Sequence, residues 1–339
     1  MPGSKSSEKS RVGIRDVARA AGVSIATVSQ VLNGKGRLPD ATRTRVREVA
    51  DQLGYQPHAA ARSLAGGRSG LIGLTFSTDT EIPLPLTDTH YYQLVINAAT
   101  EAALGRGYCL VVGTQTPQTD IWKRLALDGV LVVDPVLGDE VPGTLRKRGT
   151  PMVLMGSDPN GEFSDPCVDN DNAAGTRKLL DHLWERGARQ IAMFVYPVLD
   201  SFNIVCEEAY RAWCAEREIE PSLLVFPAAW HVNPRKLAVE ALSAPDRPDA
   251  AYCLEDDLGL ETVRAALDCN LRVPDDLMIA VSADYDTFPD VPLTTLECDP
   301  ARTAREATNL LLDLVEERPV SERSIEIPMR LVPRASTDR

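Results

Sequence analysis

The chain of 339 residues contains no long hydrophobic run and no N-terminal secretion signal. None of its apolar stretches approaches the roughly 18 residues that are needed to span a bilayer. The first ten residues, MPGSKSSEKS, are polar and contain nothing like the apolar core of a signal peptide. These absences argue against a membrane protein and against secretion, so we expect the protein in the cytoplasm, with no membrane partner.

The sequence also lacks the usual spacings of metal ligands and catalytic groups. Its seven cysteines include no CxxC pair, and a dispersed odd number in a cytoplasmic chain is typical of buried free thiols. Its four histidines show no metal-ligand spacing, GGRSG lacks the spacing of a nucleotide loop, and no GxSxG motif occurs. We therefore expect no metal, no cofactor and no enzymatic activity.

Basic residues are scarce everywhere except at the front of the chain. Residues 69–339 carry 24 Lys and Arg against 44 Asp and Glu, a balance of −20. Residues 1–68 carry 12 against 5, a balance of +7. A basic head on an acidic body indicates that only the head meets a polyanion. Charge alone leaves open a basic head that is merely solvated.

The basic head contains two short amphipathic segments around one glycine, in IRDVARAAGVSIATVSQVLNGKG at residues 14–36. The pattern predicts a helix over 15–21, a sharp turn at Gly22, and a second helix over 25–32 capped by Ser24. Ala18 must be small where the helices cross, and Val28 wedges between them. This spacing is typical of a helix-turn-helix.

The outward face of the second helix carries side chains without a structural task. Such a helix enters the major groove of DNA, where glutamine can bond adenine and apolar groups can contact thymine methyls. We predict base contacts from Ile25, Ala26, Ser29 and Gln30. Short polar groups suited to phosphate oxygens are Ser24, Thr27 and Asn33. The alternative is an ordinary helical hairpin with a polar face.

A third helix is predicted over 40–53, and a shorter segment, PHAAARSLAGG, follows at 57–67. The third helix carries three arginines and an inward apolar stripe. The following segment is too short for a stable isolated helix, since about 12–15 residues are already marginal in water. Something outside the segment must therefore order it.

Residues 14–74 resemble the lactose-repressor (LacI) family of transcription factors, and the resemblance continues to IEIPMRLVPR near the C-terminus. It implies a homodimer on a pseudo-palindromic double-stranded operator. It also implies a hinge helix whose Leu64 enters the minor groove, with Ala61 facing its twin, and a phosphate contact from Tyr55. The commonest family sequence has arginine where this chain has Gln30, so we expect an altered base preference.

The body alternates apolar runs with helical patterns, which predicts doubly wound parallel sheets. The buried runs are LIGLTF, YCLVVG, DGVLVVD, PMVLMG, QIAMFVY, SLLVFP, DAAYCL and DLMIAVS, and the intervening helices include 91–106, 172–186, 203–219 and 258–269. The family resemblance makes the body two lobes like a type I periplasmic binding protein.

The predicted fold is therefore an N-terminal all-α helix-turn-helix headpiece followed by an α/β body of two doubly wound parallel-sheet lobes. The predicted divisions are a disordered tail at 1–12, the helix-turn-helix domain at 13–56, a hinge helix and linker at 57–68, and an effector-binding and dimerisation domain at 69–339. Within that domain we place lobe one at 69–158 and 289–320, and lobe two at 159–288 and 321–339. The chain is expected to cross between lobes near 157–163, 284–290 and 319–323.

The resemblance implies an effector site in the cleft between the lobes, with a ligand whose identity the sequence leaves open. Family aromatics match Tyr91, Tyr92 and Trp230, while Cys206 replaces the arginine that sugar- and purine-binding members use. The remaining family positions fall at Glu255 and Asp256, near Gly156, and near Ala283 or Asp284. The acids at 255–257 could suit a cationic or aromatic ligand, or they could belong to a solvated loop. A regulator without any effector also stays open.

We predict a dimeric, sequence-specific transcriptional repressor under allosteric control by a small molecule. It would be associated with the nucleoid when bound to DNA. No leucine heptad follows the body, so a tetramer is not expected. Two alternatives remain: a ligand-binding module or enzyme with a basic head, and an architectural DNA binder of low specificity.

Overall fold

The computed structural model describes residues 12–32, 36–55, 68–77, 90–114, 125–161, 164–227, 233–282 and 292–339. The chain divides into two compact units, Met1–Leu71 and Ile72–Arg339. Most of the predicted tail and hinge, including Ala61 and Leu64, lies outside the described residues. Within the described part, no helix has the length and apolar character that crossing a membrane requires.

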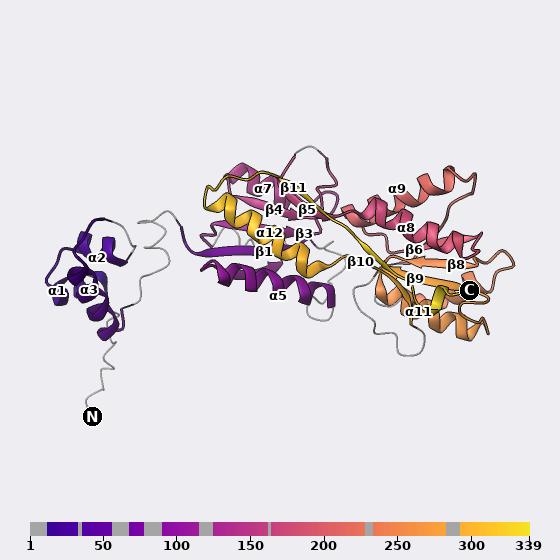
Figure 1. The fold of residues 1–339 in the computed structure, drawn as a ribbon, viewed down its shortest axis with the longest axis horizontal. Coiled ribbons are helices and arrows are strands. Elements are labelled where there is room, and N and C mark those ends of the chain that lie inside the picture. The colour runs from indigo at the N-terminus through magenta and orange to yellow at the C-terminus, as the bar shows by residue number, and fades with distance from the viewer. Residues whose placement is uncertain are drawn as a thin grey trace, which may run out of the picture. The chain divides into compact units, whose positions relative to one another are not determined.

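The first unit contains α1 (Ile14–Ala21), α2 (Ile25–Leu32) and α3 (Asp40–Gln52), all three close to their predicted bounds (Figure 1). Gly22 follows α1 with φ 64°, a left-handed conformation that favours glycine. Ser24 Oγ accepts a hydrogen bond from Thr27 N at 3.0 Å and so caps α2, as predicted. The helices share one small core, made by Val17, Ala18, Ala21, Val28, Val31, Val46 and Ala50.

Lobe one of the second unit is built on a six-stranded sheet with the order β11-β5-β4-β3-β1-β2. The pairings of β11 with β5, β5 with β4, β4 with β3 and β3 with β1 are all parallel. Its strands are β1 (Leu71–Phe76), β2 (Cys109–Thr114), β3 (Gly129–Val133), β4 (Met152–Met155), β5 (Cys167–Asn170) and β11 (Ser324–Ile327). These include four of the eight predicted strands, while β5 and β11 were not anticipated.

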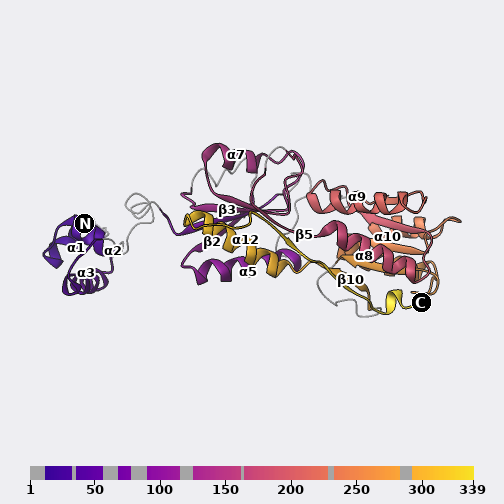
Figure 2. The ribbon, with the colours of Figure 1, turned by 45° about the horizontal axis from the view of Figure 1, so that its top comes forward.

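Helices cover both faces of the sheet of lobe one, and the alternating side chains of its strands explain why. Leu131 and Val133 face the core under α5 (His90–Gly105) and α12 (Pro300–Val315), which lie side by side (Figures 1 and 2). Val130 and Val132 face the other way, against α7 (Glu140–Arg148). A strand buried on both faces reads as a continuous apolar run, which is why β3 was predictable.

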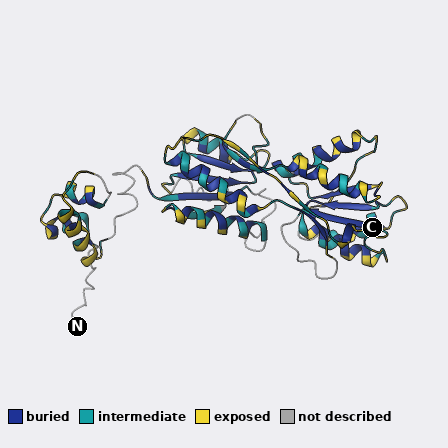
Figure 3. Cartoon of the chain, viewed as in Figure 1, coloured by how far each residue is buried: buried dark blue, intermediate teal, exposed yellow. Residues whose placement is uncertain are grey.

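Lobe two also has a six-stranded sheet with helices on both faces, in the order β12-β10-β9-β8-β6-β7. Among its described strands, the pairing of β12 with β10 is antiparallel and the other pairings are parallel. One face packs against α8 (Asn172–Glu185) and α9 (Ser201–Ala215), and the other against α10 (Pro234–Leu242) and α11 (Asp256–Asp268). Its strands are β6 (Ile191–Val195), β7 (Ser222–Val225), β8 (Ala250–Cys253), β9 (Met278–Ser282), β10 (Thr294–Glu297) and β12 (Arg330–Val332). The strands β6, β8, β9 and β10 are mainly buried and form the centre of the lobe (Figure 3), whereas β7 and β12 at the two edges are half-buried or exposed.

The sheet memberships place the lobe crossings later in the chain than the sequence suggested. Because β5 and β11 belong to lobe one and β10 to lobe two, the chain crosses at about 170–172, 297–300 and 327–330. The predicted crossings near 157–163, 284–290 and 319–323 are therefore misplaced. Strands of four residues with mixed burial, such as CVDN and SIEI, carry too little hydrophobic pattern to be recognised.

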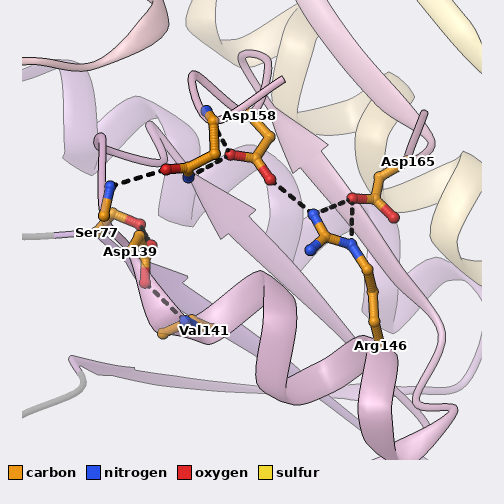
Figure 4. A network of polar contacts seen from close by, with 8 residues as sticks. Ser77, Asp139, Val141, Arg146, Asp158 and Asp165 are labelled. Carbon is orange, nitrogen blue, oxygen red and sulfur yellow. Dashed lines mark hydrogen bonds and ion pairs between the residues drawn. The ribbon is translucent and has the colours of Figure 1, made fainter. Parts of the chain in front are cut away.

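A polar network in lobe one ties α7 to the loop that connects β4 with β5 (Figure 4). Arg146 Nη2 lies 2.6 Å from Asp158 and 2.5 Å from Asp165, so one guanidinium holds both arms of that loop. Asp139 caps α7 by accepting from Val141 N at 2.8 Å, and Ser77, just after β1, also donates to Asp139. This network fixes the carboxyl ends of β1 and β4 relative to α7.

The prediction of buried free thiols is confirmed for the absence of disulfides and only partly for burial. All seven cysteines are free, as expected. Cys206, Cys214 and Cys253 are buried, whereas three others are half-buried and Cys109 is exposed. The exposed thiol lies on β2, at the edge of its sheet, where one side of the strand has no neighbouring strand among the described residues.

Candidate DNA interface and inter-lobe ligand site

The face of α2 that was predicted to contact bases points away from the headpiece core. Ile25 is 45% exposed, although it is a large apolar side chain in a small domain. Ala26 and Gln30 are exposed, and Ser29 is half-buried. Val28 and Val31, on the opposite side of the helix, are fully buried. The buried face thus holds α2 in place and leaves Ile25, Ala26 and Gln30 accessible on the outward face.

The predicted phosphate contacts at the start of α2 are two hydroxyls joined to each other. Ser24 Oγ and Thr27 Oγ1 lie 2.8 Å apart, and Ser24 Oγ also accepts from Thr27 N. The pair has two hydroxyl protons and uses one in the mutual bond. One O–H therefore remains that can donate to a phosphate oxygen beside the helix N-terminus.

The remaining predicted DNA contacts are distributed around the same domain. Tyr55 is half-buried and packs against the headpiece core, with its N–H bonded to the carbonyl of Ala50 at 2.9 Å. Asn33 lies outside the described residues. Gly36 has φ 82° and lies against the Gln30 amide, where an added Cβ would approach Gln30 Oε1 to 3.1 Å. Arg43 Nη2, 2.6 Å from the Gly36 carbonyl, holds that turn in place.

A second candidate site lies where the two lobes of the body meet. Val136 and Asp200 form an isolated antiparallel bridge, and Leu137 N donates to the carbonyl of Leu199 at 2.7 Å. Ser157 N donates to Ser201 Oγ at 3.0 Å. We call this region the inter-lobe junction. It lies beyond the carboxyl ends of β3, β4 and β6, where ligands bind in open α/β sheets.

Carboxyl groups from both lobes converge at this junction, and we call them the acidic cluster. Lobe one contributes Asp134 after β3 and Asp169 on β5, while lobe two contributes Asp200 before α9, Glu255 after β8 and Asp257 in the first turn of α11. Tyr91 and Tyr196 join them, with the Tyr91 hydroxyl donating to Asp134 at 3.4 Å and that of Tyr196 to Asp257 at 2.6 Å.

Burial and mutual repulsion raise the pKa values of the acidic cluster. Burial is the larger cause for Asp134, whose pKa lies well above its usual range, and the charges of Asp200 and Asp169 add to it. Burial raises the pKa of Asp169 to about 6 and also raises the pKa of Asp200. Glu255 follows the same pattern, with burial first and the charges of Asp257 and Asp200 next. These groups therefore form one electrostatically coupled set.

The structure brings some predicted effector residues to the junction and not others. Tyr91 and Glu255 lie there. Cys206 is fully buried, and burial raises the pKa of its thiol, with a smaller contribution from the charges of Asp200 and Glu255. Tyr92 is 9% exposed and stacks edge-on against Phe76 at 4.6 Å, so its ring belongs to the core of lobe one. Trp230 and Asp284 lie outside the described residues.

The sequence analysis missed Asp134, Asp169, Asp200 and Tyr196. Asp134 and Tyr196 each follow a correctly predicted strand directly, so the rule that ligands bind beyond the carboxyl ends of strands could have found them. Asp169 could not be found in that way because its strand, β5, was not recognised. Gly156 lies at the lobe contact, where an added Cβ would approach Ser201 Oγ to 2.8 Å.

Comparison with known proteins identifies the family. The profile of "Bacterial regulatory proteins, lacI family" matches residues 13–58, and that of "Periplasmic binding protein-like domain" matches residues 180–337. The HTH-type transcriptional repressor PurR of Proteus mirabilis (strain HI4320) is 30% identical over 349 residues, covering 95% of this chain and 96% of the relative. The chain belongs to the LacI family. It is a DNA-binding transcriptional regulator and not an enzyme.

Solved structures agree with this assignment. A lac repressor dimer bound to operator and the anti-inducer ONPF matches with a TM-score of 0.81 at 23% identity, covering 97% of this chain and 99% of that one. A complex of the transcriptional regulator CelR with cellobiose matches with a TM-score of 0.67 at 26% identity, covering 96% and 100%. These likenesses confirm the predicted fold of a helix-turn-helix headpiece and a two-lobed α/β body.

Proposed function

We propose that this LacI-family regulator is a dimeric repressor that binds a pseudo-palindromic operator through α2, in the cytoplasm, under the control of a small molecule held at the inter-lobe junction. The observation that carries the proposal is the outward face of α2, where Ile25, Ala26 and Gln30 are exposed on a helix that the headpiece core holds in place. Two such helices, one from each protomer, would read the two half-sites.

Each predicted contact has a distinct task in this proposal. Gln30 can bond an adenine edge through its amide, while Ile25 and Ala26 can contact thymine methyls. Ser24, Thr27, Asn33 and Tyr55 would hold the backbone and set the register. The resemblance to the family further assigns Ala61 and Leu64 to the minor groove at the operator centre, where an apolar wedge bends DNA.

The exposed edges of the two sheets support the dimer. β2 ends one sheet and β7 ends the other, and each presents an exposed apolar side chain, Val112 at 40% and Val225 at 55%. Leu104, at the end of α5, is 59% exposed. Unpaired apolar edge strands are normally covered in folded proteins, and a second protomer would cover these.

Control by a ligand follows from the way the lobes meet. A small molecule between the carboxyl ends of the strands would favour one arrangement of the lobes over another, by its difference in affinity for the two. CelR was solved with cellobiose and the lac repressor with ONPF, so ligand-bound states occur among the similar structures. The change would reach the operator through the linker and the dimer face.

Selection of bound duplexes from a random DNA library, with the full-length protein, tests this proposal. We expect a pseudo-palindrome whose affinity falls steeply with salt, with a log–log slope of about −0.9 per phosphate contacted. Gln30→Ala should relax the preference at one position in each half-site, by about 10- to 100-fold per base pair.

The matched control is Gln52→Ala, an exposed glutamine at the end of α3, which should recover the wild-type site. An enriched site that Gln30→Ala leaves unchanged would contradict base reading by α2 and favour the architectural binder. The absence of any enriched site would contradict sequence-specific binding altogether.

A further inference from the structure

We propose that the effector of this regulator is an organic cation, a molecule with amine or guanidinium nitrogens that binds the acidic cluster at the inter-lobe junction. This inference rests on the proposed function, which places an effector at the same junction, and it adds the chemical class of the ligand. Three independent observations support it: carboxylates without cations, buried oxygens without donors, and aromatic rings beside them.

The half-buried carboxyl groups of the acidic cluster lack the arginine partners that several other acids of the body have. Arg146 pairs with Asp158 and Asp165, Arg106 with Asp313 and Glu316, and Arg330 and Arg334 with Glu297. In the described part of the chain, no lysine or arginine forms an ion pair with a member of the acidic cluster. Buried charges require partners, so a cation from outside the chain is the missing component.

Unpartnered oxygens at the same place give the second observation. Asn172 is 3% exposed and Asn203 is 8% exposed, and in each the side-chain Oδ1 has no hydrogen-bond partner. Their amide nitrogens donate to Asp169 at 3.1 Å and to Asp200 at 3.0 Å, which fixes the orientation of both amides beside the acidic cluster.

Glu255 provides a third such oxygen, because its Oε2 is shielded from solvent and has no partner. The amide oxygens of Asn172 and Asn203 can only accept hydrogen bonds. The other buried side-chain oxygens without a partner in the described part of the chain are Asn170 Oδ1 and the hydroxyls of Thr75 and Thr176. A buried acceptor without a donor is costly, and a ligand with several N–H groups would satisfy the oxygens of Asn172, Asn203 and Glu255. A ligand that fits this site should therefore carry hydrogen-bond donors as well as positive charge.

The aromatic rings distinguish an organic cation from a metal ion. In the described residues, no three histidine, cysteine or acidic side chains come together closely enough to hold a metal. Tyr91 and Tyr196 instead place rings beside Asp134 and Asp257. Such rings can contact the methylene groups of an amine, or a guanidinium face, through cation–π interactions. A neutral sugar would also supply donors, but it would leave the charge of the acidic cluster uncompensated.

The test compares cationic and neutral probes on the full-length protein, at low and matched ionic strength, with putrescine and butane-1,4-diol as the pair matched in size. The cationic probes are putrescine, agmatine and spermidine, and the neutral ones are butane-1,4-diol, cellobiose and adenine. Thermal unfolding of the body and calorimetric titration report binding. We expect at least one cation to stabilise the body and bind, while butane-1,4-diol has no effect.

Asp200→Asn is the decisive variant, because Asp200 couples to Asp134, Asp169 and Glu255. Asparagine keeps the α9 cap that Asp200 makes with Asn203 N, so the fold is preserved. The loss of one buried charge should weaken the cation by about tenfold or more. Asp139→Asn is the matched control, since Asp139 caps α7 in the same way outside the acidic cluster, and it should bind the cation as the wild type does.

The outcomes separate this inference from the function on which it rests. Binding of cellobiose or adenine that Asp200→Asn leaves unchanged would overturn the inference, as would the failure of all three cations. Operator binding is measured in parallel on the same preparations. If a cation binds but no operator is enriched, the proposed function fails while the ligand class stands; if an operator is enriched and no cation binds, the reverse holds.

Discussion

The headpiece and the inter-lobe junction are the two candidate binding sites of this protein, and they are built in opposite ways. The headpiece belongs to the basic part of the chain, and its binding side chains are exposed on α2, within eight consecutive residues. The junction is acidic, most of its groups are half-buried, and they come from segments between residues 91 and 257. The side chains of the headpiece site come from one short segment of the chain. The side chains of the junction come together only when the whole body has folded.

This contrast has an energetic side. The binding residues of α2 cost the headpiece little, because exposed side chains contribute little to stability in the absence of DNA. The acidic cluster instead sets buried carboxylates against one another, so the ligand-free body carries unfavourable electrostatic energy. Binding at the junction should therefore stabilise the body strongly, whereas operator binding should leave it almost unchanged.

The largest expected effect is the loss of operator affinity when the headpiece is unfolded and the body stays folded. Val28 is fully buried in a core of seven small apolar side chains, so Val28→Asp places an unpaired charge there and should unfold the domain. Operator affinity should fall to the non-specific level, by about 10³-fold or more. Gel-shift titration measures the loss, and the thermal transition of the body serves as the internal control. Retained operator affinity would mean that the seven-residue core does not support α2.

A smaller effect, of opposite sign for stability and for binding, is expected at the junction. Glu255→Gln replaces a carboxyl group whose charged form is disfavoured by burial and by the charges of Asp257 and Asp200, and whose Oε2 has no partner. The variant should therefore raise the free energy of unfolding of the ligand-free body by about 1–2 kcal/mol. The body should then melt about 2–6 °C higher. The same variant should bind the cationic effector more weakly.

Differential scanning calorimetry measures this gain in stability. Glu240→Gln, an exposed position on α10 whose carboxylate lies 4.0 Å from Lys236, is the control and should change the melting temperature very little. A destabilised Glu255→Gln body would show that the carboxylate has a structural partner and would contradict the electrostatic frustration described above.

The smallest effect concerns pH and isolates Asp169. Burial raises its folded pKa to about 6, above the value of 3.8 for the unconstrained group, so folding takes up a proton between these values. Its contribution to the free energy of unfolding therefore grows as pH falls through 6 and is lost as pH rises above 6. The slope is at most about 1.4 kcal/mol per pH unit for one proton.

Melting temperatures of the body at pH 8, 7, 6 and 5 measure the contribution of Asp169 to stability, as the difference between the wild type and Asp169→Asn. The variant should lose part of any rise on acidification. Other titrating groups contribute to both proteins, including the ionisable groups that face Asp169, which are Asp134, Asp200, Glu326, Tyr91, Cys167 and Cys206. His182, whose pKa burial lowers, acts in the opposite direction in both. Parallel curves would contradict a raised pKa at Asp169.

The same contrast explains how much the sequence could predict. Every headpiece helix was predictable because Ala18, Gly22 and Val28 follow local steric rules, and β1, β3 and β8 were predictable because a strand buried on both faces is apolar throughout. The short strands β5, β10, β11 and β12 carry no such signal, and the predicted lobe boundaries were wrong for that reason. The acidic cluster depends on the sheet order, which brings Asp134 and Asp169 to one edge and meets Asp200 across the junction.

The lobe contacts have a consequence for how such a regulator can change over generations. Val136 meets Asp200, and Leu137 meets Leu199, through backbone atoms, while Ser157 contributes its N–H. Backbone groups are the same for nearly every residue type, so mutation rarely removes them. The side chains of the acidic cluster can therefore be exchanged for others without altering the surfaces on which the lobes close. The ligand specificity of such proteins can therefore change in evolution while the contacts between their lobes stay the same.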